Sequence, residues 1–161
     1  MTNFERLLSV LAESQVKFIV VGGAAATAHG ASRLTQDIDV VYARDAENIR
    51  RLVAALRPYH PYLRGAPLGL PFLWEEKTIA NGLNFTLTTT LGDLDLLGEV
   101  TGGGSFEQLL PDSITLVIFG HECLCLGLEK LIAVKRAAGR PKDFEAVAEL
   151  ELILSATEGD K

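Results

Sequence analysis

Residues 20–41 read VVGGAAATAHGASRLTQDIDVV, and this stretch decides the fold that we expect. An apolar strand ends at Gly22 and Gly23, an alanine-rich segment follows, and the next strand carries Asp37 and Asp39. Successive strand side chains point to opposite faces, so the two aspartates share a face and lie roughly 6.6 Å apart. At an effective dielectric of about 20 they repel each other by about 2.5 kcal/mol. A cation between them relieves that repulsion, and Mg²⁺ (or Mn²⁺) is a natural ligand of such carboxylates.

The composition is typical of a soluble globular domain. The chain has 161 residues, of which 48% are hydrophobic and 22% charged, and its formal net charge is -6. We expect a single domain over residues 1–155, followed by a flexible tail at 156–161. The negative charge argues against broad binding to nucleic acid or to an anionic membrane, although a local basic patch could still hold a nucleotide or a tRNA end.

The expected compartment follows from what the sequence lacks. No apolar run approaches the ~18 residues that span a bilayer, and no signal-peptide pattern opens the chain, so we expect a cytoplasmic protein. The two cysteines, Cys123 and Cys125, alternate in a predicted strand and are badly placed to bridge each other. We interpret them as small buried hydrophobes. The alternative is a metal site completed by His121, for which no second ligand pair at zinc spacing appears.

Hydrophobic periodicity predicts an α/β (α+β) chain. Apolar residues at helical spacing predict helices over 3–13, 23–29, 45–56, 106–110, 128–138 and 143–154, and apolar runs predict strands over 17–21, 35–42, 83–89, 94–100, 113–118 and 122–126. Thr2 is the expected cap of the first helix. Four of the six prolines fall within 57–74, which predicts an irregular segment. That segment is either a binding loop or lid, or a mobile connection.

The order of these motifs resembles the DNA polymerase beta nucleotidyltransferase superfamily. Its signature is an apolar residue, Gly, then Gly or Ser, and later Asp-x-Asp or Asp-x-Glu, which Val21-Gly22-Gly23 and Asp37-Ile38-Asp39 match. More narrowly, residues 22–39 and 128–143 look like the small bacterial nucleotidyltransferases related to AbiEii and MenA type toxins, whereas residues 57–78 match no pattern of that group. The resemblance implies a nucleotidyltransferase fold, a small mixed central sheet with flanking helices.

The resemblance also implies an activity. The expected reaction is magnesium-dependent transfer of a nucleoside monophosphate from an NTP to a hydroxyl of an RNA end, a protein side chain or a small molecule. In a toxin–antitoxin system the acceptor would be tRNA or a partner protein. The family needs a third carboxylate, for which Asp93 and Asp95 are candidates. We favour Asp95 because leucines flank it in the manner of a central strand. The expected catalytic and metal-binding residues are therefore Asp37, Asp39 and Asp95.

Four residues are expected to hold the nucleotide. Gly22 and Gly23 would let the backbone approach the phosphates, with the next helix facing the anion. Arg33 precedes the aspartate strand, and Lys135 extends the inward stripe of its helix. Lys135 could instead be a last-turn lysine that favours the helix dipole and reaches solvent. The alternative for the whole chain is a catalytically silent protein that binds a nucleotide or a partner. The catalytic hypothesis fails if Asp37, Asp39 and Asp95 lie too far apart to share ions, or if they are buried in salt bridges with arginine.

Overall fold

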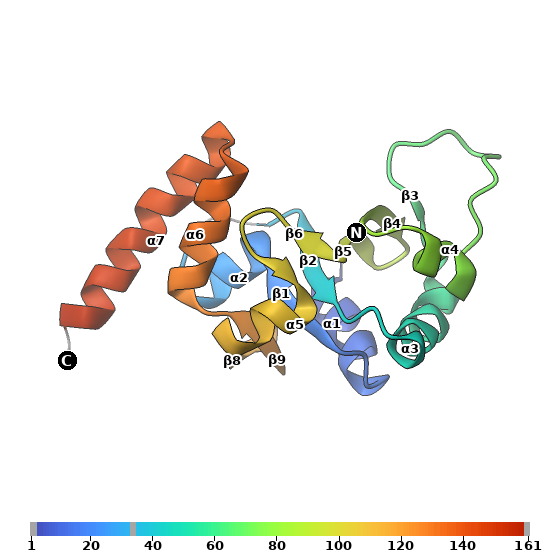
Figure 1. Ribbon diagram of the computed structural model, residues 1–161, viewed down its shortest axis with the longest axis horizontal. Coiled ribbons are helices and arrows are strands. Elements are labelled where there is room, and N and C mark those ends of the chain that lie inside the picture. Colours follow the sequence, from blue (N-terminus) through green and yellow to red (C-terminus); the bar gives the residue numbers. More distant parts are fainter. Residues whose placement is uncertain (1–2, 33–34, 160–161) are drawn as a thin grey trace.

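A mixed β-sheet runs through the centre of the protein (Figure 1). The computed structural model describes residues 3–32 and 35–159. Its central strands are Phe18–Val21 (β1), Asp37–Tyr42 (β2), Tyr62–Leu63 (β3), Phe85–Thr89 (β4), Gly92–Leu97 (β5), Ser113–Ile118 (β8) and His121–Leu126 (β9). They are arranged in the order β3-β4-β5-β2-β1-β9-β8. β2 runs antiparallel to β1 and parallel to β5, and β1 runs parallel to β9. The mixed sheet predicted from the sequence is confirmed.

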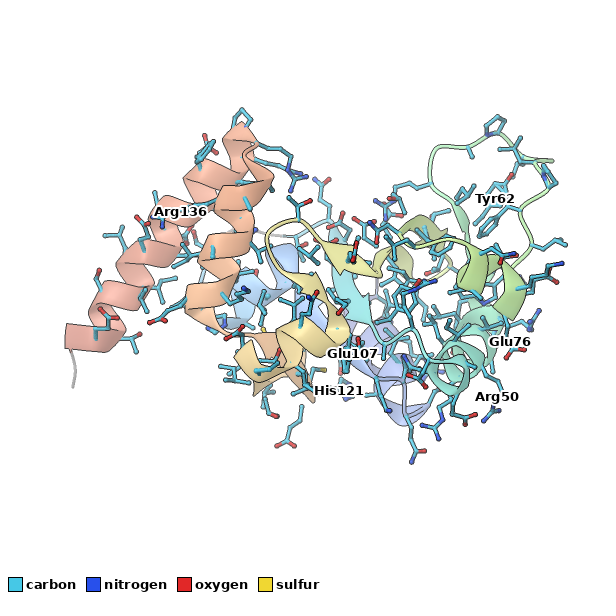
Figure 2. The ribbon with its side chains drawn as sticks, in the orientation of Figure 1. Arg50, Tyr62, Glu76, Glu107, His121 and Arg136 are labelled. Atoms are coloured by element: carbon cyan, nitrogen blue, oxygen red, sulfur yellow. The ribbon has the colours of Figure 1, made fainter. Side chains whose placement is uncertain are left out.

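Helices flank this sheet. They are Phe4–Glu13 (α1), Gly22–Ala28 (α2), Ala46–Leu56 (α3), Glu76–Asn81 (α4), Phe106–Leu109 (α5), Leu128–Ala138 (α6) and Pro141–Gly159 (α7). A small separate hairpin pairs Glu99–Val100 (β6) with Gly104–Ser105 (β7). Helices α6 and α7 lie side by side at one end of the molecule, whereas α3 and α4 lie at the other (Figure 1). Arg136 of α6 forms an ion pair with Glu151 of α7 (Figure 2).

One face of the central strands is fully buried. Ile38 and Val40 of β2 and their partners Leu94 and Leu96 of β5 have no exposed surface. The apolar stripes of α1 and α3 supply much of the same core, as their amphipathic spacing predicts. Asn48 of α3 is also buried, and its side chain bonds three backbone groups, two of Lys17 and one of Ala43. These bonds attach α3 to the residue before β1 and to the residue after β2, the strand that carries Asp37 and Asp39.

Some element boundaries differ from the prediction. The N-cap of α1 is Asn3, whose side chain accepts a hydrogen bond from Arg6 N, while Thr2 lies outside the described residues. The last helix extends beyond the predicted 143–154 to Pro141–Gly159. The segment expected to be irregular contains a 3-10 turn, Arg57–Tyr59, and the short strand β3 before a loop that ends at α4. None of the helices within 3–32 and 35–159 combines the length and apolarity that crossing a membrane requires.

Candidate active site

Strand register brings the predicted carboxylates onto one face of the sheet. In the parallel pair of β2 and β5, Asp37 lies opposite Asp93 and Asp39 lies opposite Asp95. Directly paired residues point to the same face, which is opposite to that of the buried Ile38. Asp37, Asp39 and Asp95 each offer a ligand atom within 4.8 Å of the other two. Within the described residues this is the one such group of three or more potential metal ligands, and Asp93 is not part of it.

The turn after β1 is shaped around Asp39. Gly22 follows Val21, the register partner of Asp39, and adopts a φ of +66°. This left-handed region is readily open to glycine. A Cβ at position 22 would overlap the Asp39 carboxylate, and a Cβ at Gly23 would lie 3.0 Å from Oγ1 of Thr35. The glycine pair therefore makes space for side chains of the site.

Asp39 has the most strongly raised pKa that the site shows. Burial, the charge of Asp37 and a hydrogen bond with Asp95 together raise its pKa to about 8. Burial and the charge of Asp95 likewise raise the pKa of Asp37. Oδ1 of Asp39 is buried, and no described residue offers it a hydrogen bond. An unpaired buried carboxylate oxygen next to two further carboxylates is a donor set that fits a hard divalent cation.

Cationic side chains face these carboxylates across a pocket of about 390 Å³. Besides the aspartates, the glycine pair and Thr35, the lining includes Lys135 of α6, Arg140 between α6 and α7, and Lys142 of α7. Burial lowers the pKa of Lys135, whose ammonium is near Asp143 and Asp39. This half-buried lysine lies in the pocket and not out in solvent, which favours the prediction that it faces a nucleotide.

Asp143 and Arg140 form the rim of the same pocket. The carboxylate of Asp143 is 3% exposed and accepts hydrogen bonds from the backbone N–H and the guanidinium of Arg140. Its pairing with Arg140 lowers the pKa of Asp143 despite its burial. A second pocket of about 310 Å³ adjoins Asp39, Asp95 and Lys135 and has a more apolar lining that includes Leu97, Val100, Leu131 and Val134.

The sequence did not single out Arg64, which contacts the carboxylates from the end of the sheet where β3 and β4 lie. It follows β3, and its guanidinium lies 2.9 Å from Asp95, 3.3 Å from Asp93 and 3.7 Å from Asp37. Its side chain is 27% exposed, and those of the three aspartates are 22–38% exposed. The carboxylates thus lie close enough to share an ion, and their ion pairs with Arg64 are partly exposed, with Nε of Arg64 itself buried. The sequence offered no signal for Arg64, because the residues around it match no motif.

The other candidates have simpler positions. Arg33 lies outside the described residues. His29 ends α2 and its ring bonds the carbonyl of Leu126. Cys123 and Cys125 are buried free thiols, and no cluster of metal ligands in the described part of the chain includes them.

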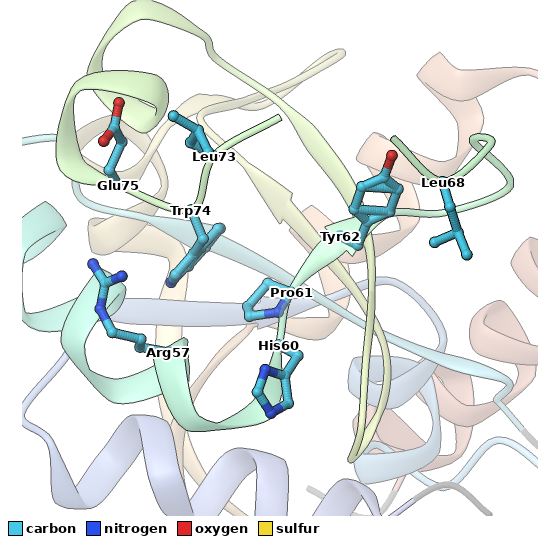
Figure 3. A pocket seen from close by; sticks show the side chains of 8 residues that line it. All are labelled: Arg57, His60, Pro61, Tyr62, Leu68, Leu73, Trp74 and Glu75. Atoms are coloured by element: carbon cyan, nitrogen blue, oxygen red, sulfur yellow. The ribbon is translucent and has the colours of Figure 1, made fainter. Parts of the chain in front are cut away.

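A third pocket lies along the loop that follows β3. Its volume is about 570 Å³, and its lining shares no residue with the two pockets beside the aspartates. Figure 3 shows its side chains, which are Arg57, His60, Pro61, Tyr62, Leu68, Leu73, Trp74 and Glu75.

Comparison with known proteins identifies the fold. No family model and no curated protein matches the chain. The crystal structure of the lincosamide antibiotic adenylyltransferase LnuA with lincomycin bound is 16% identical, and the match covers 95% of this chain and 98% of that chain with a TM-score of 0.62. The crystal structure of ANT(2'')-Ia in complex with adenylyl-2''-tobramycin is 14% identical, with coverage of 98% and 95% and a TM-score of 0.53.

A third solved structure also shares this fold. An antigenic nucleotidyltransferase-like protein from Paracoccidioides brasiliensis is 15% identical, with coverage of 94% of this chain and 73% of that chain and a TM-score of 0.55. At these identities the likeness concerns the fold alone. The predicted nucleotidyltransferase fold is confirmed, while the narrower resemblance to toxin-related proteins stays a prediction.

Proposed function

We propose that this chain is a nucleotidyltransferase that uses Mg²⁺ or Mn²⁺ to move a nucleoside monophosphate from an NTP to a hydroxyl acceptor. The observation that carries the proposal is the meeting of three carboxylates within 4.8 Å with basic side chains across one pocket. This arrangement offers oxygen ligands to a metal on one side and positive charge to a triphosphate on the other. The fold shared with two adenylyltransferases of antibiotics supports the same activity.

Each group would have a distinct task. Asp37, Asp39 and Asp95 would hold the divalent ions, which supply Lewis-acid stabilisation of the phosphate oxygens when bound. Lys135, Arg140 and Lys142 line the pocket where they would neutralise the triphosphate.

The reaction itself needs little covalent chemistry from the protein. The acceptor oxygen attacks the α-phosphorus, the bond from that phosphorus to the bridging oxygen breaks, and pyrophosphate leaves with the electron pair. Asp95 is the carboxylate that we assign to receive the proton of the acceptor hydroxyl and to pass it to solvent. The protein's main contribution is then to hold the two reactants in line in a charged, half-buried site.

A small-molecule hydroxyl is the acceptor that we favour. LnuA and ANT(2'')-Ia match this chain over nearly its whole length, and both were solved with a small antibiotic or its adenylyl derivative. The second pocket beside Asp95 is small and partly apolar, and the net charge of -6 is unfavourable for an extended RNA. Because the sequence also resembles toxin-related proteins, the experiment below includes tRNA and partner proteins as alternative acceptors.

One observation favours a second candidate function. The ion pairs of Arg64 with Asp37, Asp93 and Asp95 offset part of the negative charge of the cluster without a metal, as expected of a protein that keeps the fold only to bind a nucleotide or a partner.

Radiolabelled NTPs separate the two functions. The protein is incubated with each α-labelled NTP and Mg²⁺ in the presence of lincosamide and aminoglycoside antibiotics, total tRNA, or protein extract, with Asp39→Asn as the inactive control. Label on an acceptor that the control does not produce supports the enzyme. If no acceptor gains label and NTP still raises the melting temperature, the binding function holds.

A further inference from the structure

Arg64 is held at the carboxylate cluster by both its backbone and its side chain. Its N–H bonds the carbonyl of Thr86, which continues the pairing of β3 with β4 by one residue. Its guanidinium donates to the carbonyl of Leu87 at 2.7 Å and to Oδ1 of Asp95 at 2.9 Å. The side chain therefore reaches across β4 to the acidic strands.

The ion pairs of Arg64 are unequal. The contact with Asp95 is a hydrogen bond, whereas Nε, 3.3 Å from Asp93, has no hydrogen-bond partner among the described residues. The carboxylate of Asp37 is the farthest of the three partners, at 3.7 Å from the guanidinium of Arg64. Within the described residues, Asp39 forms no ion pair with that guanidinium. The guanidinium of Arg64 thus pairs with three of the four carboxylates on this face of the sheet, and the fourth, Asp39, is not among its partners.

We propose that Arg64 is an internal counter-cation that competes with the divalent metal for Asp37 and Asp95. The inference rests on the proposed function, because it concerns the metal site of that function. Two of the three potential metal ligands are also partners of the guanidinium, and an ion placed among them would be repelled by the positive charge of Arg64. Metal entry therefore requires Arg64 to withdraw from these two carboxylates or to lose part of its attraction to them.

The segment after Arg64 is an uncharged and partly exposed loop. Residues 65–74 carry no charged side chain, and Leu68 and Leu73 are 92% and 62% exposed. Tyr62 holds the middle of the loop, because its hydroxyl bonds Pro67 and Leu70 and its ring contacts Phe72. Trp74 holds its end by donating Nε1–H to the carbonyl of Val53. In Figure 1 the loop extends away from the sheet, and Figure 2 places Tyr62 beneath it. Withdrawal of the guanidinium toward solvent would break its bonds to Leu87 and Asp95, while the backbone bond of Arg64 to Thr86 could stay in place.

Metal affinity without nucleotide tests the proposal. Binding of Mn²⁺ to the full chain is measured by the loss of its free electron paramagnetic resonance signal, in the absence of NTP. Arg64→Met should tighten the Mn²⁺ Kd by about tenfold, because a competing unit charge next to a half-buried site is removed. Arg64→Lys, which keeps a charge but not the fork that reaches several carboxylates, should give an intermediate Kd.

Arg57→Met is the matched control. Arg57 is exposed at the start of the same segment and, within the described residues, forms no ion pair with the aspartates, so its removal changes net charge without touching the carboxylate cluster. Its Mn²⁺ Kd should stay within about twofold of wild type. Thermal unfolding in EDTA should show a lower melting temperature for Arg64→Met, since the cluster loses its counter-ion.

Each outcome decides a different claim. If the Mn²⁺ Kd of Arg64→Met equals or exceeds that of wild type, Arg64 does not compete with the metal. The proposed function is unaffected by that result if the wild type transfers nucleotide. Should Arg64→Met fail to fold, an Arg64→Lys Kd equal to wild type overturns the competition. If wild type transfers no label but Arg64→Met binds Mn²⁺ more tightly, the competition holds and the enzymatic proposal fails. Absence of Mn²⁺ binding in wild type and in every folded variant overturns the competition, and the transfer of label then decides the proposed function by itself.

Discussion

Gly22 leaves the space that the carboxylate of Asp39 occupies, because a Cβ at position 22 would overlap that carboxylate. The glycine also holds a left-handed φ of +66° between β1 and α2. The glycine pair was expected to let the backbone approach a phosphate. The structure gives Gly22 a second role, because its lack of a side chain makes room for the carboxylate of Asp39. The strand register that sets Val21 opposite Asp39 brings them together.

Gly22→Ala should therefore be costly. The left-handed backbone and the overlap with Asp39 together should lower the free energy of unfolding by about 3 kcal/mol, and Mn²⁺ affinity should fall because Asp39 is displaced. Urea denaturation measures the first effect and metal titration the second.

Gly139→Ala is the control for this substitution. Gly139 ends α6 with a φ of +69°, and a Cβ there would meet nothing closer than 3.9 Å. It should cost only the left-handed conformation, about 1 kcal/mol, and leave Mn²⁺ binding intact. Equal losses for the two variants would contradict the steric relation between Gly22 and Asp39.

The fold and most of the carboxylate cluster could be predicted because their signals are local. The alternation in 37–41 places both aspartates on one face, and the leucines around Asp95 indicate a central strand. Helix α6 was predicted with the bounds observed, since its apolar stripe is regular and Gly139 ends it. These features depend on neighbours a few residues apart.

What could not be predicted depends on partners distant in sequence. The position of Arg64 is set by β3 pairing with β4, and β3 is too short to have a periodic pattern. The same holds for the polar contacts of Asn48 with Lys17, which join α3 to the chain before β1. Helix α4 was missed because its six residues give too little periodicity.

Asp39→Asn should change how stability depends on pH. Because burial, Asp37 and Asp95 raise the pKa of Asp39 to about 8, the folded state keeps a proton that the unfolded chain loses near its ordinary pKa of 3.8. The metal-free free energy of unfolding should thus be highest at low pH in this window and fall as the pH rises toward about 8. Asp39→Asn should flatten this fall and be more stable than wild type at alkaline pH, by at least about 1 kcal/mol.

Urea denaturation in EDTA across this pH range measures the effect. Some fall should remain in Asp39→Asn, because the pKa of Asp37 is raised as well. Asp112→Asn, which removes an exposed carboxylate from the turn Leu110–Asp112, should keep the wild-type profile. An Asp39→Asn profile as steep as that of wild type would mean that Asp39 titrates alike in both states.

The two candidates for the third carboxylate can be separated by substitution. Asp95→Asn should lower kcat for nucleotide transfer by about 100-fold or more, because Asp95 shares the 4.8 Å cluster. Asp93 lies outside the cluster and contacts Arg64, so Asp93→Asn should lower kcat by less than about tenfold. Single-turnover transfer at saturating NTP and Mg²⁺ measures both, and a larger loss for Asp93→Asn would reverse the assignment.

Lys135 should act on the nucleotide rather than on the fold. Its ammonium is half-buried in the pocket that the glycine pair and the aspartates line, and burial lowers its pKa, so it has lost hydration that a triphosphate could replace. Lys135→Met should raise the KM for NTP by about tenfold, since it removes a charge-assisted bond, and leave the melting temperature without nucleotide unchanged or higher. Lys130→Met, on the same helix but in the pocket formed with His29 and Asp112, should keep the wild-type KM. A loss of stability in Lys135→Met with an unaltered KM would instead assign Lys135 to the ion-pair network of Asp143.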